Sequence, residues 1–527
     1  MAIQDIVTGG VGSAPGTVAF MVTRGLGAIT PTEDLEYVVQ VDWNNDGDYS
    51  DANEDITADV WSIEMDRGRD YASQLTGKAV AGRCRITLDN SDGKYSPMNT
   101  ASALSGNILP GRKVRVRARW PLNVTLWTGR LDSILPETIS PNDVPTAVLE
   151  ASGSLKWLQG ERLKSAASAG NDTGALIGVA LTAAGVAAGD QVLDTGATTT
   201  GRWYEPDTSV LEAVRRLEET ELGFFYEDEL GRFVFEKRGH RLLTDHLTPQ
   251  AEFSDAAGAS YPFRTIREED PLREIFNEIP VIVQPYTVET LAVLWTLTGE
   301  TPTLAAGQSK IWWAQYPNAA TPGGAYVDAW TTPVVGTDIT QTGVANGDIA
   351  VVVSKFANAM KITVTNNHGS ATATLTLIQA RGTAVTQDDP TRIVSVDTDS
   401  QDAYGVRTYR LPGPWYATTS DAQSIADLAL TRHKDPQAIL SISFYANASL
   451  GLKQQALLRK ISDRITITAN NNSQLGIDGR EFFIEAIHHR VTRGRLLMLT
   501  WDLSQAELDS GFWILGTSLL GIDTRLY

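Results

Sequence analysis

Residues 113–120 read KVRVRARW, with an apolar residue at every second position and a cation at each position between them. The period of two is that of a β-strand, and it places Val114, Val116, Ala118 and Trp120 on one face. The segment therefore predicts one strand of a one-sided sheet or barrel wall. We interpret the cationic face as a solvated surface that discourages pairing at a sheet edge. The alternative is docking against an acidic neighbour.

Strand patterns on both sides of this segment predict a mainly β fold. They lie at residues 37–42, 83–89, 440–444, 464–468, 482–487 and 496–501. The single cysteine, Cys84, shares a strand face with Ile86 and Leu88, so we expect a buried, unreactive thiol. Residues 286–395 consist of short Thr- and Val-rich strand patterns separated by Pro and Gly, which is typical of an independent β-sandwich inserted into the chain.

Two capping boxes predict helices between the strands. Ser209-Val-Leu-Glu212 begins a helix whose apolar residues recur until Gly223, and residues 420–423 (SDAQ) begin a second helix. Residues 224–236 follow the first helix with the pattern of a β-hairpin. Helix and hairpin together predict a small α/β unit.

Length and charge restrict the classes of protein that the chain can represent. Its 527 residues are too many for one ordinary core and predict three or four domains. The formal net charge of −19 argues against phosphate binding as the main role. The chain has no apolar run as long as a membrane span and no signal-peptide pattern at its start, so we expect a soluble protein without membrane insertion.

Motifs of the common enzyme classes do not occur, neither a Walker loop nor HExxH, GxSxG or CxxC, and we expect no enzymatic activity. The acidic residues from Glu218 to Glu229 could supply paired carboxylates for glycoside hydrolysis, but their position on the polar side of a helix and in a turn favours a solvated face. His488 and His489 are neighbours in a strand pattern. Their rings should therefore point to opposite faces and cannot easily share a metal.

Residues 42–50 (DWNNDGDYS) have the spacing of a cation-binding loop. Oxygen-bearing side chains occur at loop positions 1, 3, 5, 7 and 9, with Gly47 at position 6, as in calcium loops of the EF-hand type. The candidate ligands are Asp42, Asn44, Asp46, Asp48, Ser50 and Glu54.

Two features depart from that calcium motif. The preceding residues predict a strand instead of a helix, and position 12 is Asn53, with the acid one residue later at Glu54. Calcium binding and a polar Asx turn without a metal therefore both remain open.

Several segments, taken together and in this order, resemble the hub or tail-tip proteins of tailed bacteriophages, especially minor tail proteins of the siphophage type. The segments are VDWNNDGDYSDANEDITADV (41–60), LDNSDGKYSPMN (88–99), ILPGRKVRVRA (108–118), LWTGRLDSI (126–134), SVLEAVRRLEETELGFFYEDELGRFVFEKR (209–238), DRITIT (463–468) and FFIEAIHHRVTRGRLLMLTWDLS (482–504). The resemblance covers most of residues 35–285 and 400–505.

The resemblance implies a mainly β fold with α+β parts. Together with the composition and strand patterns, which predict the N-terminal arm and the insertion, it divides the chain into an N-terminal extended arm (1–34), a first tail-tube-like β-barrel domain (35–160), a small α/β domain with helix and hairpin (161–264), a second such barrel (265–285 plus 400–510), an inserted β-sandwich (286–399) and a C-terminal tail (511–527). It also implies a homotrimer at the tail tip of the virion, assembled in the host cytoplasm. Its partners would be the distal tail protein ring, the tape-measure protein and the tip fibre or spike proteins.

These expectations favour a structural baseplate hub that joins the tail tube to the tip fibres or spike. Part of the DNA exit channel would run through it, and DNA would slide past acidic walls without specific binding. The alternative is a receptor-binding adhesin whose inserted β-sandwich recognises host-surface carbohydrate through Trp312, Trp313 and Trp330, although Trp is also common in cores. A cell-wall glycosidase is the least favoured reading.

Overall fold

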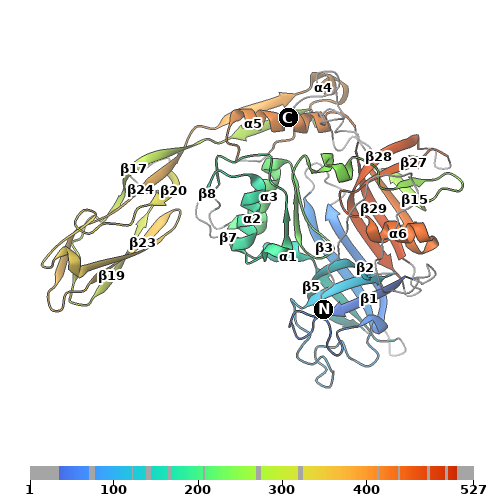
Figure 1. Ribbon diagram of the computed structural model, residues 1–527, viewed down its shortest axis with the longest axis horizontal. Coiled ribbons are helices and arrows are strands. Elements are labelled where there is room, and N and C mark those ends of the chain that lie inside the picture. The colour runs from blue at the N-terminus through green and yellow to red at the C-terminus, as the bar shows by residue number, and fades with distance from the viewer. Residues whose placement is uncertain are drawn as a thin grey trace, which may run out of the picture.

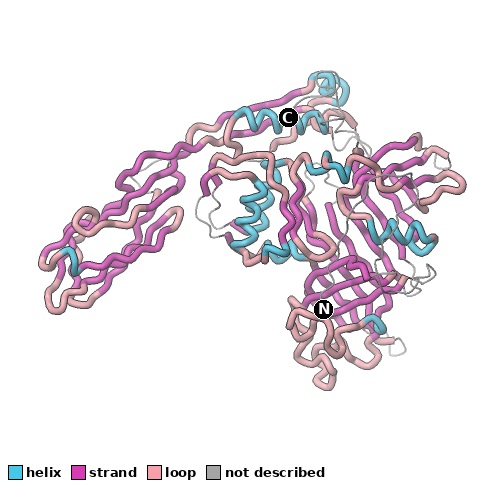
Figure 2. The backbone as a smooth tube through the Cα atoms, viewed as in Figure 1, coloured by secondary structure: helices cyan, strands magenta, loops and turns pink. Residues whose placement is uncertain are grey.

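The computed structural model describes residues 35–69, 78–120, 123–137, 144–163, 168–203, 205, 208–268, 275–317, 324–411, 415–436, 439–471, 475–492 and 497–506. The expected N-terminal arm and C-terminal tail lie outside these residues. The described chain is mainly β, as predicted, with several sheets and a few helices (Figure 2). Within it, no helix is both long and apolar enough to cross a membrane.

A twelve-stranded sheet forms the body of the molecule, with strands from the start of the chain (blue), from its middle (green) and from its end (orange-red) (Figure 1). The first half contains β1 (Glu36–Val41), β2 (Val60–Arg69), β3 (Ala79–Asp89), β4 (Lys113–Arg119), β5 (Asn123–Glu137) and β6 (Thr146–Ser152). The second half contains β14 (Glu252–Ser254), β15 (Thr265–Glu268), β26 (Ile439–Tyr445), β27 (Arg464–Ala469), β28 (Ile477–Val491) and β29 (Leu497–Gln505). The main path runs β1-β4-β5-β6-β3-β2-β28-β29-β26-β15, and β27 pairs with both β28 and β14.

The pairing of β2 with β28 joins the two halves. The strands run antiparallel from Ile63 opposite Val491 to Gly68 opposite Ala486. The expectation of two separate closed barrels is wrong for the described residues, because neither half closes on itself and both belong to one sheet. The reason is that β2, the strand that would have to pair with β1 to close the first barrel, uses its free side for β28.

The strand faces follow the alternation in the sequence. In β4, Val114, Val116 and Ala118 are fully buried, and Trp120 just beyond it is buried as well, which confirms the one-sided strand. Cys84 in β3 is fully buried on the same face as Ile86 and Leu88, as predicted.

A small α/β unit packs on the sheet between the two halves (Figure 1, teal and green). Its helices are α1 (Ser154–Leu158), α2 (Thr173–Ala183) and α3 (Val210–Glu221). Its strands are β7 (Arg162–Leu163), β8 (Ser168–Ala169), β9 (Gln191–Leu193), β10 (Arg202–Trp203), β11 (Thr208–Ser209), β12 (Phe224–Glu227) and β13 (Phe233–Glu236). The unit shares one apolar core with the sheet.

The sequence signals for this unit are largely confirmed. The Ser209 side chain accepts a hydrogen bond from the Glu212 backbone N–H and so caps α3, and β12 and β13 form the expected hairpin. The helix ends one residue before the predicted stop, because Leu222 itself adopts the left-handed conformation (φ 52°).

A second small unit lies beside the body. β16 (Glu278–Val283) pairs with β25 (Thr391–Val396), and α5 (Thr419–His433) packs on them around a separate core. Residues 265–285 therefore divide, since β15 pairs with β26 in the large sheet whereas β16 does not. The N-cap of α5 is Thr418, two residues before the predicted Ser420, and its Oγ1 accepts from the Asp421 N–H at 3.1 Å. The remaining helices are α4 (Thr398–Tyr404) and α6 (Leu450–Leu458).

The insertion extends away from the body as an arm (Figure 1, yellow). One sheet contains β17 (Tyr286–Thr296), β18 (Thr303–Leu304), β20 (Gly324–Trp330), β21 (Ile339–Thr342) and β24 (Ala373–Gln387). The other contains β19 (Ser309–Gln315), β22 (Ile349–Lys355) and β23 (Ala359–Asn366). Both sheets contribute to one apolar core that is separate from the core of the body.

Gly68 allows the close approach of β2 and β28, and its replacement tests that junction. Its φ is +119°, and a Cβ at this position would collide with the Glu485 carbonyl oxygen and the Ala486 backbone. We predict that Gly68→Ala lowers the free energy of unfolding by about 2–5 kcal/mol, measured by chemical denaturation. Gly239→Ala is the control, because a Cβ there meets no atom within 4 Å. Equal stability of the two variants would contradict a close-packed junction.

Candidate functional site

The loop between β1 and η1 (Thr57–Asp59) is built by side chains that hydrogen-bond to its own backbone. The two oxygens of Asp42 accept from the backbone N–H groups of Asp46 (3.1 Å) and Gly47 (3.0 Å). Asp46 in turn accepts from the Asp48 N–H at 3.1 Å. Gly47 has a φ of +97°, a left-handed conformation that explains glycine at this position. The loop therefore folds around its carboxylates as a series of Asx turns.

The structure brings three of the six predicted ligands together. One carboxylate oxygen each of Asp42, Asp46 and Glu54 lies within 4.8 Å of the others. The Asn44 amide donates to Asp46 at 2.9 Å and therefore borders the group. The Asp48 carboxylate is not part of it.

Asp48 and Ser50 bond to each other instead. The Ser50 backbone N–H and hydroxyl donate to the same Asp48 oxygen, at 2.8 and 2.9 Å. These two side chains were predicted as ligands, but in the structure they bond to each other and the Asp48 carboxylate binds the loop backbone.

Glu54 closes the loop from inside. Asn53 adopts a left-handed conformation (φ 70°), and its carbonyl accepts from the indole N–H of Trp43 at 2.9 Å. Glu54 is 1% exposed; its Oε2 accepts from the Asp51 N–H at 3.0 Å, whereas its Oε1 is buried without a hydrogen-bond partner. Burial and the neighbouring acids raise the pKa of Glu54.

The segment after the loop covers the outer edge of β1. The Val41 N–H donates to the Glu54 carbonyl at 2.9 Å, and the Ile56 N–H donates to the Val39 carbonyl at 3.0 Å. These bonds lie on the side of β1 opposite β4, where an unpaired strand edge would otherwise be exposed. The loop thus fixes the end of the large sheet.

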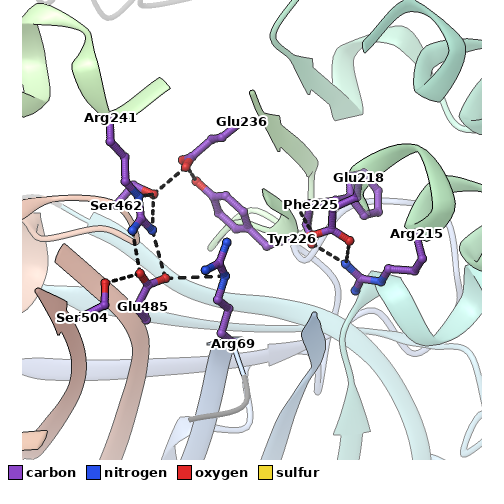
Figure 3. Close-up of polar contacts among 10 residues, drawn as sticks. All are labelled: Arg69, Arg215, Glu218, Phe225, Tyr226, Glu236, Arg241, Ser462, Glu485 and Ser504. Atoms are coloured by element: carbon purple, nitrogen blue, oxygen red, sulfur yellow. Dashed lines mark hydrogen bonds and ion pairs between the residues drawn. The ribbon is translucent and has the colours of Figure 1, made fainter. Parts of the chain in front are cut away.

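A second polar cluster lies where the two halves of the sheet meet the α/β unit (Figure 3). Glu485 of β28 is 2% exposed and accepts two hydrogen bonds from Arg241, at 2.6 and 2.9 Å. Ser504 of β29 donates to the same carboxylate at 2.5 Å, and Arg69 of β2 lies 3.6 Å from it. Burial alone would raise the pKa of Glu485, but the two arginines hold it at about 2.

The cluster continues into the α/β unit. Ser462 donates to Glu236 of β13 at 2.5 Å, and Tyr226 of β12 donates to the other oxygen of Glu236 at 2.8 Å (Figure 3). Ser462 also accepts from Arg241 at 3.2 Å. This network therefore connects β2, the hairpin and the β27–β28–β29 region through charged groups that are mostly withdrawn from water.

The acidic residues from Glu218 to Glu229 were interpreted as a solvated face, and for several of them this is wrong. Glu218 bonds to Arg215 at 2.7 Å and accepts from the Phe225 N–H at 2.7 Å. Glu227 is 3% exposed and accepts from the backbone of Gly82 and Leu155. The donors to Glu227 come from distant segments that a local pattern does not reveal, whereas the partners of Glu218 lie in its own helix and in the strand that follows it.

Other members of this acidic group are also paired. Glu221 is fully buried and accepts from Thr173 and the Thr198 N–H. Glu229 lies 2.8 Å from Arg67 and 2.7 Å from Lys460. The four carboxylates of Glu218, Glu221, Glu227 and Glu229 therefore make structural contacts instead of forming a pair that faces a substrate.

The two adjacent histidines have different environments. His489 is 5% exposed, and burial lowers its pKa to about 3. The His488 ring is half-exposed and lies 2.9 Å from Asp502; burial lowers its pKa, but the bond to Asp502 outweighs this and raises it. The rings are therefore not a shared metal site.

Comparison with known proteins gives a likeness in fold. Neither a protein-family model nor a curated protein sequence matches the chain. The 43 kDa tail protein of prophage MuSo2 from Shewanella oneidensis is 11% identical with a TM-score of 0.47, over 90% of this chain and 98% of that chain. The tail protein from Neisseria meningitidis MC58 is 10% identical with a TM-score of 0.49, over the same shares of 90% and 98%.

A third solved structure is the E. coli protein c3393, a type VI secretion component with structural similarity to the T4 bacteriophage tail proteins gp27 and gp5. It is 10% identical with a TM-score of 0.36, over 89% of this chain and 77% of that chain. The alignments to the two tail proteins extend over 90% of this chain. Likeness at 10–11% identity and these TM-scores assigns no function by itself.

The Glu485 cluster gives a direct test of the junction. We predict that Glu485→Gln lowers the free energy of unfolding by about 3–5 kcal/mol in chemical denaturation, because Arg241 and Arg69 lose their buried counter-charge. The pKa of Glu485 is depressed from its usual 4.5 to about 2, so this contribution is present above pH 4.5 and is lost as the pH falls toward 2.

The matched control is Glu64→Gln. Glu64 pairs with Arg490 across the same two strands at 3.3 Å, but both side chains are more than half exposed. Loss of the Glu64–Arg490 pair should lower the free energy of unfolding by at most about 1 kcal/mol. An equally small effect of Glu485→Gln at pH 7 would contradict the structural role of the buried cluster.

Proposed function

We propose that this chain is a structural hub at the tip of a bacteriophage tail, without catalytic activity of its own. The observation that carries the proposal is the composition of the large sheet, in which six strands from the start of the chain continue into six strands from its middle and end. One chain therefore presents two walls of equal strand number side by side. The order of the segments that resemble phage hub proteins supports the same reading.

A chain with two β-sheet walls could connect a sixfold ring of tail proteins to a threefold spike or fibre. The resemblance implies a sixfold tail tube and distal tail ring above the hub and a threefold spike or fibre below it. Three copies with two walls each would present six walls to the ring and a threefold arrangement to the tip. Tape-measure protein and tip fibre or spike proteins are the other partners that this position implies.

The free end of the sheet supports assembly through strand edges. Among the described residues, β15 pairs with β26 alone and its side chains are largely exposed, whereas the edge of β1 is covered by residues 54–57. An exposed edge is a ready site for pairing with another chain. Assembly into a ring would bury it.

The charge of the chain fits a channel for DNA. A net charge of −19 repels the phosphate backbone, so DNA would pass the hub without specific binding. The arm extends away from the large sheet, so that its bulk would lie outside such a channel (Figure 1).

Stoichiometry tests the hub proposal. We expect native mass measurement of the purified chain at high concentration to give three times the chain mass of 57.1 kDa, and we expect the assembled tip to contain three copies of the chain. A stable monomer within the particle, or a hexamer, would contradict the two-wall arrangement. Imaging of the intact particle with a label on the chain should place it at the tail tip, and any other position would also reject the proposal.

One observation favours a second candidate function, an adhesin that binds host-surface carbohydrate. Trp313 is 48% exposed and stacks on Phe356, with ring centroids 5.9 Å apart. Trp330, in contrast, is 6% exposed in the core of the arm and donates to the Phe356 carbonyl, and Trp312 donates to Glu300. Of the three tryptophans predicted for this role, Trp313 is the one that offers an open ring face, and sugars stack on such faces.

Binding to carbohydrate is tested on a glycan array with the full chain. If the arm is an adhesin, the chain binds particular glycans, and Trp313→Ala reduces that signal at least about tenfold, the loss expected for one stacked ring. Trp157→Ala is the control, because Trp157 is an exposed tryptophan of α1 in the body. Absence of binding, or equal loss in both variants, would reject this second function and leave the hub proposal unaffected.

A further inference from the structure

We infer that residues 42–54 bind a calcium ion, with Asp42, Asp46 and Glu54 as its carboxylate ligands. This site goes beyond the hub function and stands whether or not the chain is a hub. The proximity of three acids within 4.8 Å does not establish a site alone, because carboxylates also gather at surfaces without an ion. The state of Glu54 supplies the second observation.

Glu54 is a buried carboxylate with an unsatisfied oxygen. It is 1% exposed, and its Oε1 has no hydrogen-bond partner. A buried oxygen in this state costs free energy unless something neutralises it. Glu54 belongs to the same group as Asp42 and Asp46. Within the described residues, no Lys or Arg forms an ion pair with any of these three acids. A cation among these carboxylates would satisfy the orphan oxygen and the local charge together.

The donor atoms select the class of ion. The ligand atoms of Asp42, Asp46 and Glu54 are all carboxylate oxygens, which suit a hard cation and not a soft one. A twelve-residue spacing with glycine at position 6 is that of loops that bind Ca²⁺. Mg²⁺ requires a stricter octahedral arrangement and is bound less readily by such flexible loops.

The structure explains why the closing acid of the calcium motif is Glu54, one residue after position 12. Position 12 is Asn53, whose left-handed backbone and carbonyl bond to Trp43 turn the next residue, Glu54, toward the loop interior. Glu54 therefore takes the place of the closing glutamate with one extra residue. Position 7 of such loops contributes its backbone carbonyl, so the Asp48 side chain is free to bond to Ser50.

The position of the loop indicates what the ion would stabilise. Asp42 directly follows β1, and the Glu54 carbonyl accepts from Val41 on the outer edge of that strand. The Arg115 guanidinium of β4 lies 4.0 Å from the centre of the Tyr49 ring, so the loop also packs on the sheet. A bound ion would connect the end of β1 to the segment that covers its edge and would stabilise that cover.

Thermal unfolding and terbium luminescence test the inference on the full chain. After removal of metal with EDTA, addition of 2 mM CaCl₂ should raise the melting temperature by about 3 °C or more, because the ion binds the folded state alone. Terbium, which occupies oxygen-rich calcium sites, should emit on excitation of tryptophan, because Trp43 lies within the loop, and CaCl₂ should displace it. Trp43→Phe should remove most of that emission.

Matched variants separate a site from a general charge effect. Asp46→Asn and Glu54→Gln should each abolish the calcium-dependent shift and weaken terbium binding at least about tenfold. Asp46 is exposed, so its variant should fold even if Glu54→Gln does not. Asp48→Asn removes the same charge from a side chain outside the group and should retain both signals.

Three results would overturn the inference. They are an unchanged melting temperature with CaCl₂, an equal shift with MgCl₂, and equal losses in Asp46→Asn and Asp48→Asn. None of them bears on the mass of the assembly, so failure of the calcium site and failure of the hub proposal are distinguishable.

Discussion

The antiparallel contact between β2 and β28 is the constraint on which the arrangement of the body depends. It joins strands from opposite ends of the chain, and it works only because Gly68 lets the two backbones approach closely. Directly at that contact, Glu485 accepts hydrogen bonds from Arg241 and Ser504 and forms an ion pair with Arg69. A buried charge cluster of this kind is costly to assemble and costly to break. It therefore adds less to stability than to specificity, because a slipped register would leave Glu485 buried without its partners.

The two end strands on the main path of the large sheet, β1 and β15, differ in whether their outer edges are covered. At one end, the loop with Asp42 and Glu54 covers the edge of β1; at the other, β15 presents exposed side chains beside β26. A sheet with one covered and one open edge can add a neighbour at one end without growing into an open-ended aggregate. This asymmetry would limit the size of the ring proposed above.

Local patterns predicted the local parts of this structure. The alternation of residues 113–120, the cap at Ser209 and the burial of Cys84 depend on near neighbours in the sequence, and all three are confirmed. The joining of the two halves depends on strands that are far apart in the chain, and no local pattern encodes it. Glu227 shows the same limit: it looks solvated from its own segment, but its donors, the backbone N–H groups of Gly82 and Leu155, come from elsewhere in the fold. For the loop, spacing identified the residues, whereas only the backbone of Asn53 explains why Glu54 points inward.

The arm and the body have separate apolar cores, but strands and an ion pair connect them. The arm has its own apolar core, and the body is linked to it through the pair β16 and β25, which continues into β17 and β24. An ion pair between Arg202 of β10 and Asp328 of β20 also connects the two. Residues that share no core and few partners contribute almost independently to stability. Changes on the outer face of the arm, such as those around Trp313, should therefore leave the β2–β28 junction intact.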